Sequence, residues 1–330
     1  MKAVQLTGYG VPSKVCQCID LPDITSPGPG EVTLKVLAGP INPAELLIFE
    51  GRYASKPELP YQPGIEAVGV IEQIGDGVTN VAVGDKVISL GRQNWVQRVN
   101  LGEEQVIKVP HSASTAQLAM LKVNPATAWL MLTDYVSLQA GDWVVQNAAN
   151  SGVGHALIQL ARANGWKTLN VVRRDALIDP LKSAGADAVL VDGDDLGVRA
   201  RDVIGDGKAL LGIDAIAGSA TTRLADCLDD GGTVVNYGFL SGDPCQMTPN
   251  QTVFQDKSLK GFWLAKLMGG MSRDTLTGMY ARLAASIADG TLHTPVEATY
   301  GLEHIGAALD HAHRESRDGK ILLTPNGAVD

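Results

Sequence analysis

The sequence has few of the residues that mark disulfide-rich or membrane proteins. Only four of its 330 residues are cysteine and none forms a Cys-x-x-Cys pair, which excludes a disulfide framework and a thiol redox motif. No run approaches the roughly 18 consecutive apolar residues of a membrane span. Aromatic residues make up only 5% of the chain, whereas 45% of it is hydrophobic and 37 residues are glycine, as in a compact globular protein. We expect Cys16, Cys18, Cys227 and Cys245 to be reduced structural thiols.

Basic side chains are also outnumbered in this sequence. Twenty-seven Lys and Arg residues against 36 Asp and Glu residues leave a net charge of −9. A field of that sign repels nucleic acid and anionic lipid, so neither is expected as a partner. Residues 1–8 alternate as in a short strand and lack the patterns of a secretory signal or a transit peptide. We therefore expect a mature chain that begins at or near Met1 and a cytosolic location.

The residue pattern divides the chain into three zones. Residues 1–117 hold short β-like segments separated by Gly and Pro, as in a small β-barrel domain. Residues 118–260 alternate apolar strand-like segments with amphipathic helices, which predicts a doubly wound parallel sheet. Residues 261–330, with predicted helices at 274–290 and 302–316 and a final strand at 320–325, have too few elements for a core of their own. We expect them to pack on the first zone, so that the middle domain is an insertion.

A glycine-containing turn between a predicted strand and a predicted helix is the candidate nucleotide site. Residues 147–154 read NAANSGVG, which keeps only part of the G-x-G-x-x-G pattern. At this place the free backbone N–H groups and the positive end of the helix would meet a pyrophosphate. A tight strand-to-helix turn without a ligand is the alternative interpretation. The residues that we expect to contact the cofactor here are Asn150, Ser151, Gly152, Val153 and Gly154.

The end of the next predicted strand indicates which dinucleotide binds. A carboxylate about 20 residues after the turn would bind the ribose 2′-OH of NADH, whereas arginine would bind the 2′-phosphate of NADPH. The segment 167–172 ends in Arg173 and Arg174, with no carboxylate before Asp175. Two guanidinium groups can hold a phosphate bidentately, so we predict NADPH. The alternative is a solvated, charged strand end.

Four stretches resemble a known family. They are INPAELLIFEGRY at 41–53, VNPATAW at 123–129, QNAANSGVG at 146–154 and GFWL at 261–264. With them the chain resembles the medium-chain dehydrogenase/reductase superfamily, and within it the zinc-free 2-enoyl thioester reductases, the mitochondrial-type enoyl-CoA/ACP reductases. The resemblance implies a Rossmann domain inserted into a discontinuous GroES-like β-barrel domain. It further implies NADPH-dependent reduction of the C=C bond of a 2-enoyl thioester, and a homodimer.

The resemblance bears on metal binding as well. Zinc-containing relatives have a cysteine where this chain has Asn42, and a His-Glu pair where it has Ile65 and Glu66. Neither the four cysteines nor the six histidines supply the spacing of a tetrahedral zinc site. We therefore predict that the protein uses no metal, and one tightly held zinc ion per chain would contradict this.

The resemblance assigns roles to single residues. Tyr53 is the implied proton donor or stabiliser of the enolate oxygen, since a phenol stays protonated at neutral pH. Asn42 would orient the nicotinamide amide or the substrate carbonyl, and Trp263 would line the acyl pocket. The remaining implied cofactor contacts are Asn124, Thr127, Phe262 and Lys320. Tyr237, at the end of a predicted strand, is expected beside the cofactor because ligands sit at the carboxyl ends of parallel strands.

Each of these residues also has an ordinary structural interpretation. Tyr53 fits an amphipathic surface residue, Trp263 a core residue and Lys320 a surface lysine. Asn42 and Asn124 each precede a proline and fit turn or helix-capping residues.

Two alternatives to an enoyl reductase remain at this point. One is a quinone or α,β-unsaturated-ketone reductase that uses the same hydride chemistry. The other is a catalytically idle nucleotide-binding protein, because a fold does not imply an activity. Glu45, Leu47 and Glu50 depart from the Asp, Asn and Gln of the enoyl reductases, and Ile65 and Ala67 from an Asn and a Gly. These departures leave the substrate open.

Overall fold

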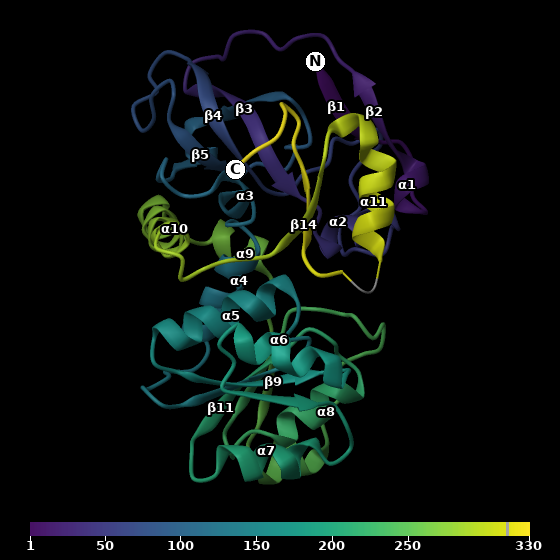
Figure 1. Ribbon diagram of the computed structural model, residues 1–330, viewed down its shortest axis with the longest axis vertical. Helices are drawn as coiled ribbons and strands as arrows, with labels where there is room; N and C mark the ends of the chain where they lie inside the picture. The colour runs from purple at the N-terminus through teal and green to yellow at the C-terminus, as the bar shows by residue number, and fades with distance from the viewer. Residues whose placement is uncertain (315–316) are drawn as a thin grey trace. The chain divides into compact units, whose positions relative to one another are not determined.

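The chain passes twice between two structural units (Figure 1). The computed structural model describes residues 1–314 and 317–330. Unit 1 comprises Met1–Val123 and Ser272–Asp330, and unit 2 comprises Asn124–Met271. The crossings therefore lie at 123/124 and 271/272, whereas the sequence pattern predicts them at 117/118 and 260/261. The first difference arises because the helix Thr115–Leu118 and the residues after it up to Val123 belong to unit 1. The second arises because the helix Leu264–Gly269 belongs to unit 2.

Unit 1 is built around a largely antiparallel sheet with the order β14-β15-β3-β4-β5-β7, in which β6 also pairs with β3. A separate antiparallel pair joins β1 and β2. The last strand of the chain, β15, pairs with β3, so the C-terminal residues share a sheet with the first zone. The strands are β1 (Lys2–Leu6), β2 (Cys16–Asp20), β3 (Glu31–Pro40), β4 (Ala67–Ile74), β5 (Lys86–Ser89), β6 (Arg98–Gly102), β7 (Val106–Lys108), β14 (Val296–Tyr300) and β15 (Lys320–Leu323).

Helices complete unit 1. Its α-helices are α1 (Pro12–Val15), α2 (Pro43–Phe49), α3 (Thr115–Leu118), α10 (Arg273–Ala288) and α11 (Ile305–His313). Short 3₁₀ turns cover Glu103–Gln105 and Leu302–His304. The helix predicted at 302–316 is thus a 3₁₀ turn followed by α11, and residues 315–316 lie outside the described residues. One core of this unit joins Phe49 of α2 edge-to-face with Trp95, with ring centroids 5.7 Å apart.

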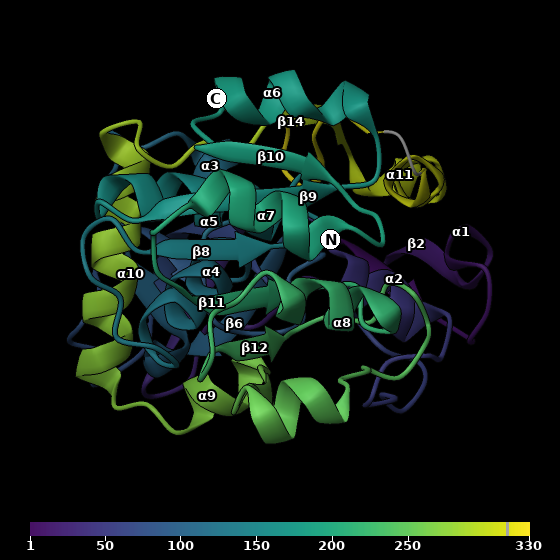
Figure 2. The ribbon, with the colours of Figure 1, turned by 90° about the horizontal axis from the view of Figure 1, so that it is seen from below.

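Unit 2 contains a six-stranded sheet with the order β10-β9-β8-β11-β12-β13, in which every neighbouring pair is parallel. Figure 2 shows strands β10 to β12 in this order. The strands are β8 (Trp143–Gln146), β9 (Lys167–Val172), β10 (Ala188–Val191), β11 (Ala209–Asp214), β12 (Thr233–Asn236) and β13 (Ser258–Gly261). The helices are α4 (Asn124–Thr133), α5 (Gly152–Ala163), α6 (Ile178–Ser183), α7 (Leu196–Ile204), α8 (Ser219–Asp226) and α9 (Leu264–Gly269), with a 3₁₀ turn at Asp175–Leu177 and a π-helix at Asn250–Phe254.

Alternating side chains of this sheet face two separate cores, as period-2 strands dictate. Leu169 and Val171 of β9 pack with residues of α7 and α8, whereas Val172 packs with residues of α5 and α6. Helices therefore cover both faces, which confirms the doubly wound fold. In residues 1–314 and 317–330 no helix is both long enough and apolar enough to cross a membrane.

Candidate functional site

The turn between β8 and α5 has the geometry of an anion site. Ser151 is the N-cap of α5, and its hydroxyl accepts a hydrogen bond from the N–H of Gly154 at 3.1 Å. Ala148 has a φ of +48°, an uncommon left-handed conformation for a residue with a Cβ. A Cβ on Gly154 would lie 2.3 Å from the carbonyl oxygen of Ala149, so only glycine fits there. The first N–H groups of this 12-residue helix are therefore held beside the end of β8.

Asn124 adds an unusual polar atom to this turn. It begins α4 and is 7% exposed, and among residues 1–314 and 317–330 its Nδ2 has no hydrogen-bond partner. A Cβ on Gly152 would lie 2.7 Å from that Nδ2, so the amide sits directly against the start of α5. A buried donor without an acceptor is costly. A ligand that supplies an acceptor here would remove that cost. Thr127, three residues further along α4, is also buried.

This unpaired amide gives the first prediction. Asn124→Leu is expected to leave the free energy of unfolding unchanged or to raise it by about 1 kcal/mol, because it removes a buried donor that has no partner. The same change is expected to weaken binding of NADP⁺ about tenfold, the loss of one hydrogen bond of about 1.4 kcal/mol. Urea unfolding and calorimetric titration measure the two quantities.

Asn170 provides the matched control for this prediction. It is fully buried in the same unit, and its amide donates to the carbonyl oxygen of Ala188 at 3.0 Å and to Thr168. Asn170→Leu is therefore expected to destabilise the protein by about 1–3 kcal/mol. If Asn124→Leu destabilises the fold as much as Asn170→Leu does, Asn124 is a structural residue and not a ligand contact.

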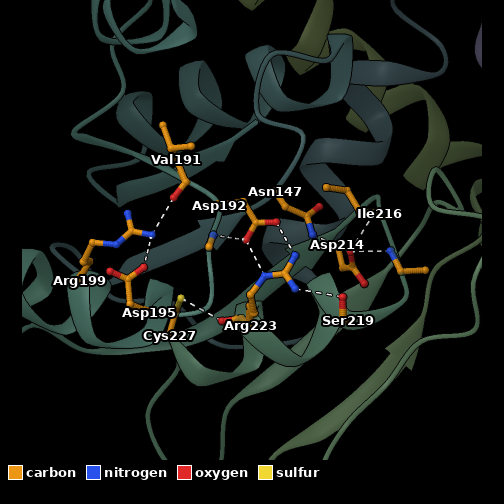
Figure 3. Close-up of polar contacts among 12 residues, drawn as sticks. Asn147, Val191, Asp192, Asp195, Arg199, Asp214, Ile216, Ser219, Arg223 and Cys227 are labelled. Atoms are coloured by element: carbon orange, nitrogen blue, oxygen red, sulfur yellow. Dashed lines mark hydrogen bonds and ion pairs between the residues drawn. The ribbon is translucent and has the colours of Figure 1, made fainter. Parts of the chain in front are cut away.

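Asn147 and Asp214 are two polar residues that the sequence analysis missed. They link the carboxyl ends of β8 and β11 by a hydrogen bond (Figure 3). The carboxylate of Asp214, at the end of β11, is fully buried and accepts from Asn147 Nδ2 at 2.7 Å and Thr221 Oγ1 at 2.6 Å. It also accepts from the N–H of Ile216 and from Asn236 Nδ2. A polar residue at the end of each of two apolar strands is the signal that could have revealed them. They fix the strand ends at the edge where ligands of such folds bind.

Tyr237 and Phe262 follow two neighbouring strands at this same edge. The N–H of Tyr237 donates to Asp214 O at 2.9 Å, and the N–H of Phe262 donates to Asn236 O at 2.8 Å. Burial raises the pKa of Tyr237 to about 12, against the opposing effect of its hydrogen bond with the Ser151 side chain. The structure thus brings Tyr237 to the turn that precedes α5.

Trp263 lies beyond the end of β13, at the N-cap of α9. It is 48% exposed, so the interpretation as a core tryptophan is wrong. The physical reason is that β13 is the edge strand of its sheet and the chain leaves the sheet at Gly261.

Three more of the predicted cofactor contacts are exposed at the same end of unit 2. They are Asn150, Arg173 and Arg174, and a ligand can reach them there.

In unit 1, Asn42 lies within a buried polar network. As N-cap of α2 it is 2% exposed, and its Nδ2 donates to Glu66 Oε1 at 2.7 Å. Its Oδ1 accepts from Lys320 Nζ at 2.6 Å. Lys320 is only 9% exposed, so the interpretation as a surface lysine is wrong. The antiparallel register of β15 against β3, continued by the bond from Ile41 N–H to Ile321 O, places Lys320 opposite Asn42.

Two further charged groups belong to this network. The Glu45 carboxylate accepts from the N–H of Asn42 at 2.7 Å and of Ile65 at 2.9 Å. Lys122 Nζ donates to the carbonyl oxygens of Ile65, Leu90 and Gly91. These residues together form the buried charge network, which consists of Asn42, Glu45, Glu66, Lys122 and Lys320.

Burial raises the pKa values of the two acids of the buried charge network and lowers those of its two lysines. It raises the pKa of Glu45 to about 8, although two backbone N–H groups oppose this shift. It also raises the pKa of Glu66, with Lys320 opposing. Burial lowers the pKa of Lys122 and of Lys320, each to about 8. Each charge is thus costly alone and depends on its partners.

Tyr53 lies in the loop after α2. It is half-buried and packs against the core cluster that contains Leu6, Ile41 and Phe49, and its N–H donates to Leu47 O at 3.1 Å. The ring is therefore anchored, more than an ordinary surface tyrosine would be. Its role as a proton donor stays a prediction.

The state of the cysteines and the geometry of potential metal ligands also bear on these sites in the described part of the chain. All four cysteines are free, and burial raises the pKa of Cys16 and of Cys227 to about 12, which makes them poor nucleophiles. Over residues 1–314 and 317–330 no group of three His, Cys, Asp or Glu residues is placed to hold a metal ion. The absence of a metal from the reaction stays a prediction.

Comparison with known families defines the class of protein. The family "Zinc-binding dehydrogenase" matches residues 152–285, and the family "Alcohol dehydrogenase GroES-like domain" matches residues 28–127. A sheet domain of GroES-like type that carries an inserted Rossmann-type domain is thereby confirmed.

Curated relatives extend over nearly the whole chain. The mitochondrial enoyl-[acyl-carrier-protein] reductase of Bos taurus is 34% identical over 98% of this chain and 88% of its own length. The enzyme of that name from Dictyostelium discoideum is 35% identical over 80% of this chain and 78% of its own. The chain belongs to the medium-chain dehydrogenase/reductase superfamily and is an oxidoreductase. The resemblance to its enoyl reductases is confirmed.

Solved structures have the same fold. A putative NADPH:quinone reductase from Bacillus thuringiensis superposes with a TM-score of 0.90 at 28% identity, over 98% of each chain. The complex of Etr1p with NADP and crotonyl-CoA has a TM-score of 0.86 at 26% identity, over 98% of this chain and 99% of the other. The mitochondrial 2-enoyl thioester reductase Etr1p/Etr2p heterodimer from Candida tropicalis has a TM-score of 0.85 at 26% identity, over the same shares.

These names contradict the prediction of a cytosolic location. Both curated relatives are named as mitochondrial enzymes. The prediction was argued from the lack of a targeting pattern in the first residues. Such a lack carries no information on where the folded protein works, and this is why it was wrong.

Proposed function

We propose that the protein reduces the C=C bond of 2-enoyl thioesters with NADPH and without a metal ion. The observation that carries the dinucleotide part is the buried, unpartnered amide of Asn124 beside the N-terminus of α5. A pyrophosphate or carboxamide oxygen would satisfy that amide and the helix N–H groups together. The substrate class is supported by the relatives named enoyl reductases and by the Etr1p complex with crotonyl-CoA.

The residues present fit a nicotinamide dinucleotide. Ser151, Gly152, Val153 and Gly154 would hold the pyrophosphate, with Asn150 at the rim of the turn and Tyr237 beside it. Asn124 and Thr127 would orient the nicotinamide, and Phe262 would pack near it. Arg173 and Arg174 would bind the 2′-phosphate.

When bound, NADPH supplies the hydride for the β-carbon of the substrate. The chain's own groups must supply a proton to the α-carbon and hold the thioester oxygen. We assign the proton to the Tyr53 hydroxyl, and we assign to Asn42 the orientation of the carbonyl. We assign to Lys320 the positioning of Asn42, whose Oδ1 it holds at 2.6 Å, in addition to the cofactor contact that the resemblance implies. Trp263, with half of its surface exposed, would line the acyl pocket.

The choice of NADPH gives the second prediction. Arg173→Gln together with Arg174→Gln is expected to lower kcat/KM for NADPH about 10²-fold, the loss of charge-assisted bonds of about 1.5–3 kcal/mol. The value for NADH should change less than about threefold, because NADH has no 2′-phosphate. Initial rates with each cofactor at fixed enoyl thioester measure both values. An unchanged ratio of the two kcat/KM values would remove the arginines from cofactor selection.

A second candidate function is supported by the putative NADPH:quinone reductase with its TM-score of 0.90. Following NADPH absorbance with a crotonyl thioester, with a quinone and without substrate separates the candidates. Oxidation with the thioester alone supports the proposal, and oxidation with the quinone alone supports the alternative. Dinucleotide binding without oxidation in any arm indicates an idle nucleotide-binding protein.

We further propose a homodimer formed at the exposed edge strand β13. Leu259 on this strand is 40% exposed, and the nearby Val253 and Phe254 are 69% and 79% exposed. Unpaired edge strands and exposed apolar patches are places where a second copy binds. Light scattering on the purified full chain tests this, and a monomer at micromolar concentration would contradict it.

A further inference from the structure

An acidic turn follows β10, next to the arginines that we assign to the 2′-phosphate. It contains Asp192, Asp194 and Asp195. Val191 and Val172 are the last register pair of β10 and β9, and the N–H of Asp192 donates to Val172 O at 2.8 Å. The register therefore places the backbone of Asp192 beside the backbone of Arg173, at the spacing of neighbouring strands, about 4.8 Å. A carboxylate in that position bears directly on which dinucleotide is accepted.

Arg223 of α8 pairs with both oxygens of the Asp192 carboxylate (Figure 3). Its Nε donates to Oδ1 at 2.7 Å and its Nη2 to Oδ2 at 2.6 Å, a two-bond fork. The N–H of Gly193 also donates to Oδ1, at 2.9 Å. The side chains of Arg223 and Asp192 are only 23% and 19% exposed, so solvent screens the pair weakly.

The two other carboxylates of this turn differ from Asp192. Asp195 pairs with Arg199 of α7 at 2.8 Å, but its side chain is 69% exposed. Asp194 is exposed as well. Charges surrounded by water act weakly at a distance. Of the three carboxylates, Asp192 is thus the one whose charge would act most strongly on a ligand at the end of β9.

We propose that Arg223 determines cofactor selectivity by masking Asp192, and this inference rests on the proposed preference for NADPH. Without Arg223, the Asp192 carboxylate would repel a 2′-phosphate and would accept a hydrogen bond from the 2′-OH of NADH. The ion pair removes both effects, so that Arg173 and Arg174 set the local charge. Arg223 is in this sense a positioning residue that acts through Asp192.

Binding of two small probes to the full chain tests this without turnover. The probes are 2′,5′-ADP, which carries the phosphate, and 5′-AMP, which lacks it, both titrated by calorimetry. Arg223→Met is expected to weaken 2′,5′-ADP about tenfold, as one unit charge would do at about 7 Å from a dianion in aqueous dielectric. Binding of 5′-AMP should stay the same or become tighter, because this probe keeps the 2′-OH that the uncovered carboxylate would accept from. Arg199→Met is the matched control and should leave both probes unchanged.

The double variant Asp192→Asn with Arg223→Met decides the mechanism. This variant removes the carboxylate of Asp192 together with the guanidinium of Arg223 that pairs with it. Its affinity for 2′,5′-ADP should therefore return to within about threefold of that of the unmodified protein. Asp192→Asn alone should keep or strengthen that binding. Thermal unfolding of each variant shows that it is folded, and the double variant supplies the test if Arg223→Met does not fold.

Three results would overturn the inference. Equal losses for both probes in Arg223→Met would show a general structural role. Failure of the double variant to regain affinity would show that Arg223 binds the phosphate itself or only packs. If the unmodified protein does not bind 2′,5′-ADP more tightly than 5′-AMP, the proposed NADPH preference fails and this inference fails with it. The unmodified protein thus separates that failure from the other two.

Discussion

Replacing Tyr53 with Phe is expected to lower kcat about 10²–10⁴-fold with an enoyl thioester and NADPH, the contribution of a positioned general acid. The substitution removes only the hydroxyl. The ring, which packs against the core cluster with Leu6, Ile41 and Phe49, is kept. The melting temperature should therefore hardly change, and KM for NADPH should stay within about twofold. Steady-state kinetics and thermal unfolding measure these quantities.

Tyr61 is the matched control for Tyr53. It packs against the same core cluster, and its hydroxyl donates to Arg92 O at 3.1 Å. Tyr61→Phe removes an equivalent hydroxyl from the same surroundings and should leave kcat within about threefold. Equal turnover in the Tyr53 variant and the unmodified protein would end the assignment of Tyr53 as proton donor. A loss of similar size in both variants would point to the packing of this cluster and not to proton transfer.

Lys320→Met is expected to reduce the free energy of unfolding by about 3–5 kcal/mol, the cost of leaving a buried charge without its partner. The ammonium donates to Asn42 Oδ1 at 2.6 Å. Its charge also lowers the pKa of Glu66 and of Glu45, against the larger effect of burial, which raises both. Methionine fills a similar volume, so the effect reports the charge and not a cavity. Urea unfolding at pH 7 measures it.

A double-mutant cycle supplies the control for Lys320. Glu66→Gln removes one of the carboxylates that the ammonium opposes, so Lys320→Met in that background should cost less than half as much. The cost should be equal in both backgrounds if Lys320 contributes only apolar packing. A single-variant cost below about 1 kcal/mol would mean that the buried charge network does not depend on this lysine.

Signals close together in the chain were enough to establish the order of the elements. The apolar strands and amphipathic helices of residues 118–260 predict a doubly wound sheet because strand and helix periods depend on neighbouring residues. The turn before α5 is recognisable for the same reason, since Ser151 caps a helix that begins at the next residue. The arginines at the end of β9 follow from counting along one strand. The medium-chain dehydrogenase/reductase resemblance rests on such short motifs.

The pairings that carry charge across the fold were decided only in three dimensions. Lys320 meets Asn42 because β15 lies antiparallel to β3, a register set by residues 278 positions apart. Arg223 pairs with Asp192 because α8, which packs against α7 and β11, brings this side chain to the turn after β10. Trp263 is exposed because it follows an edge strand. Burial, register and edge position depend on the packing of distant segments, and a local pattern does not contain them.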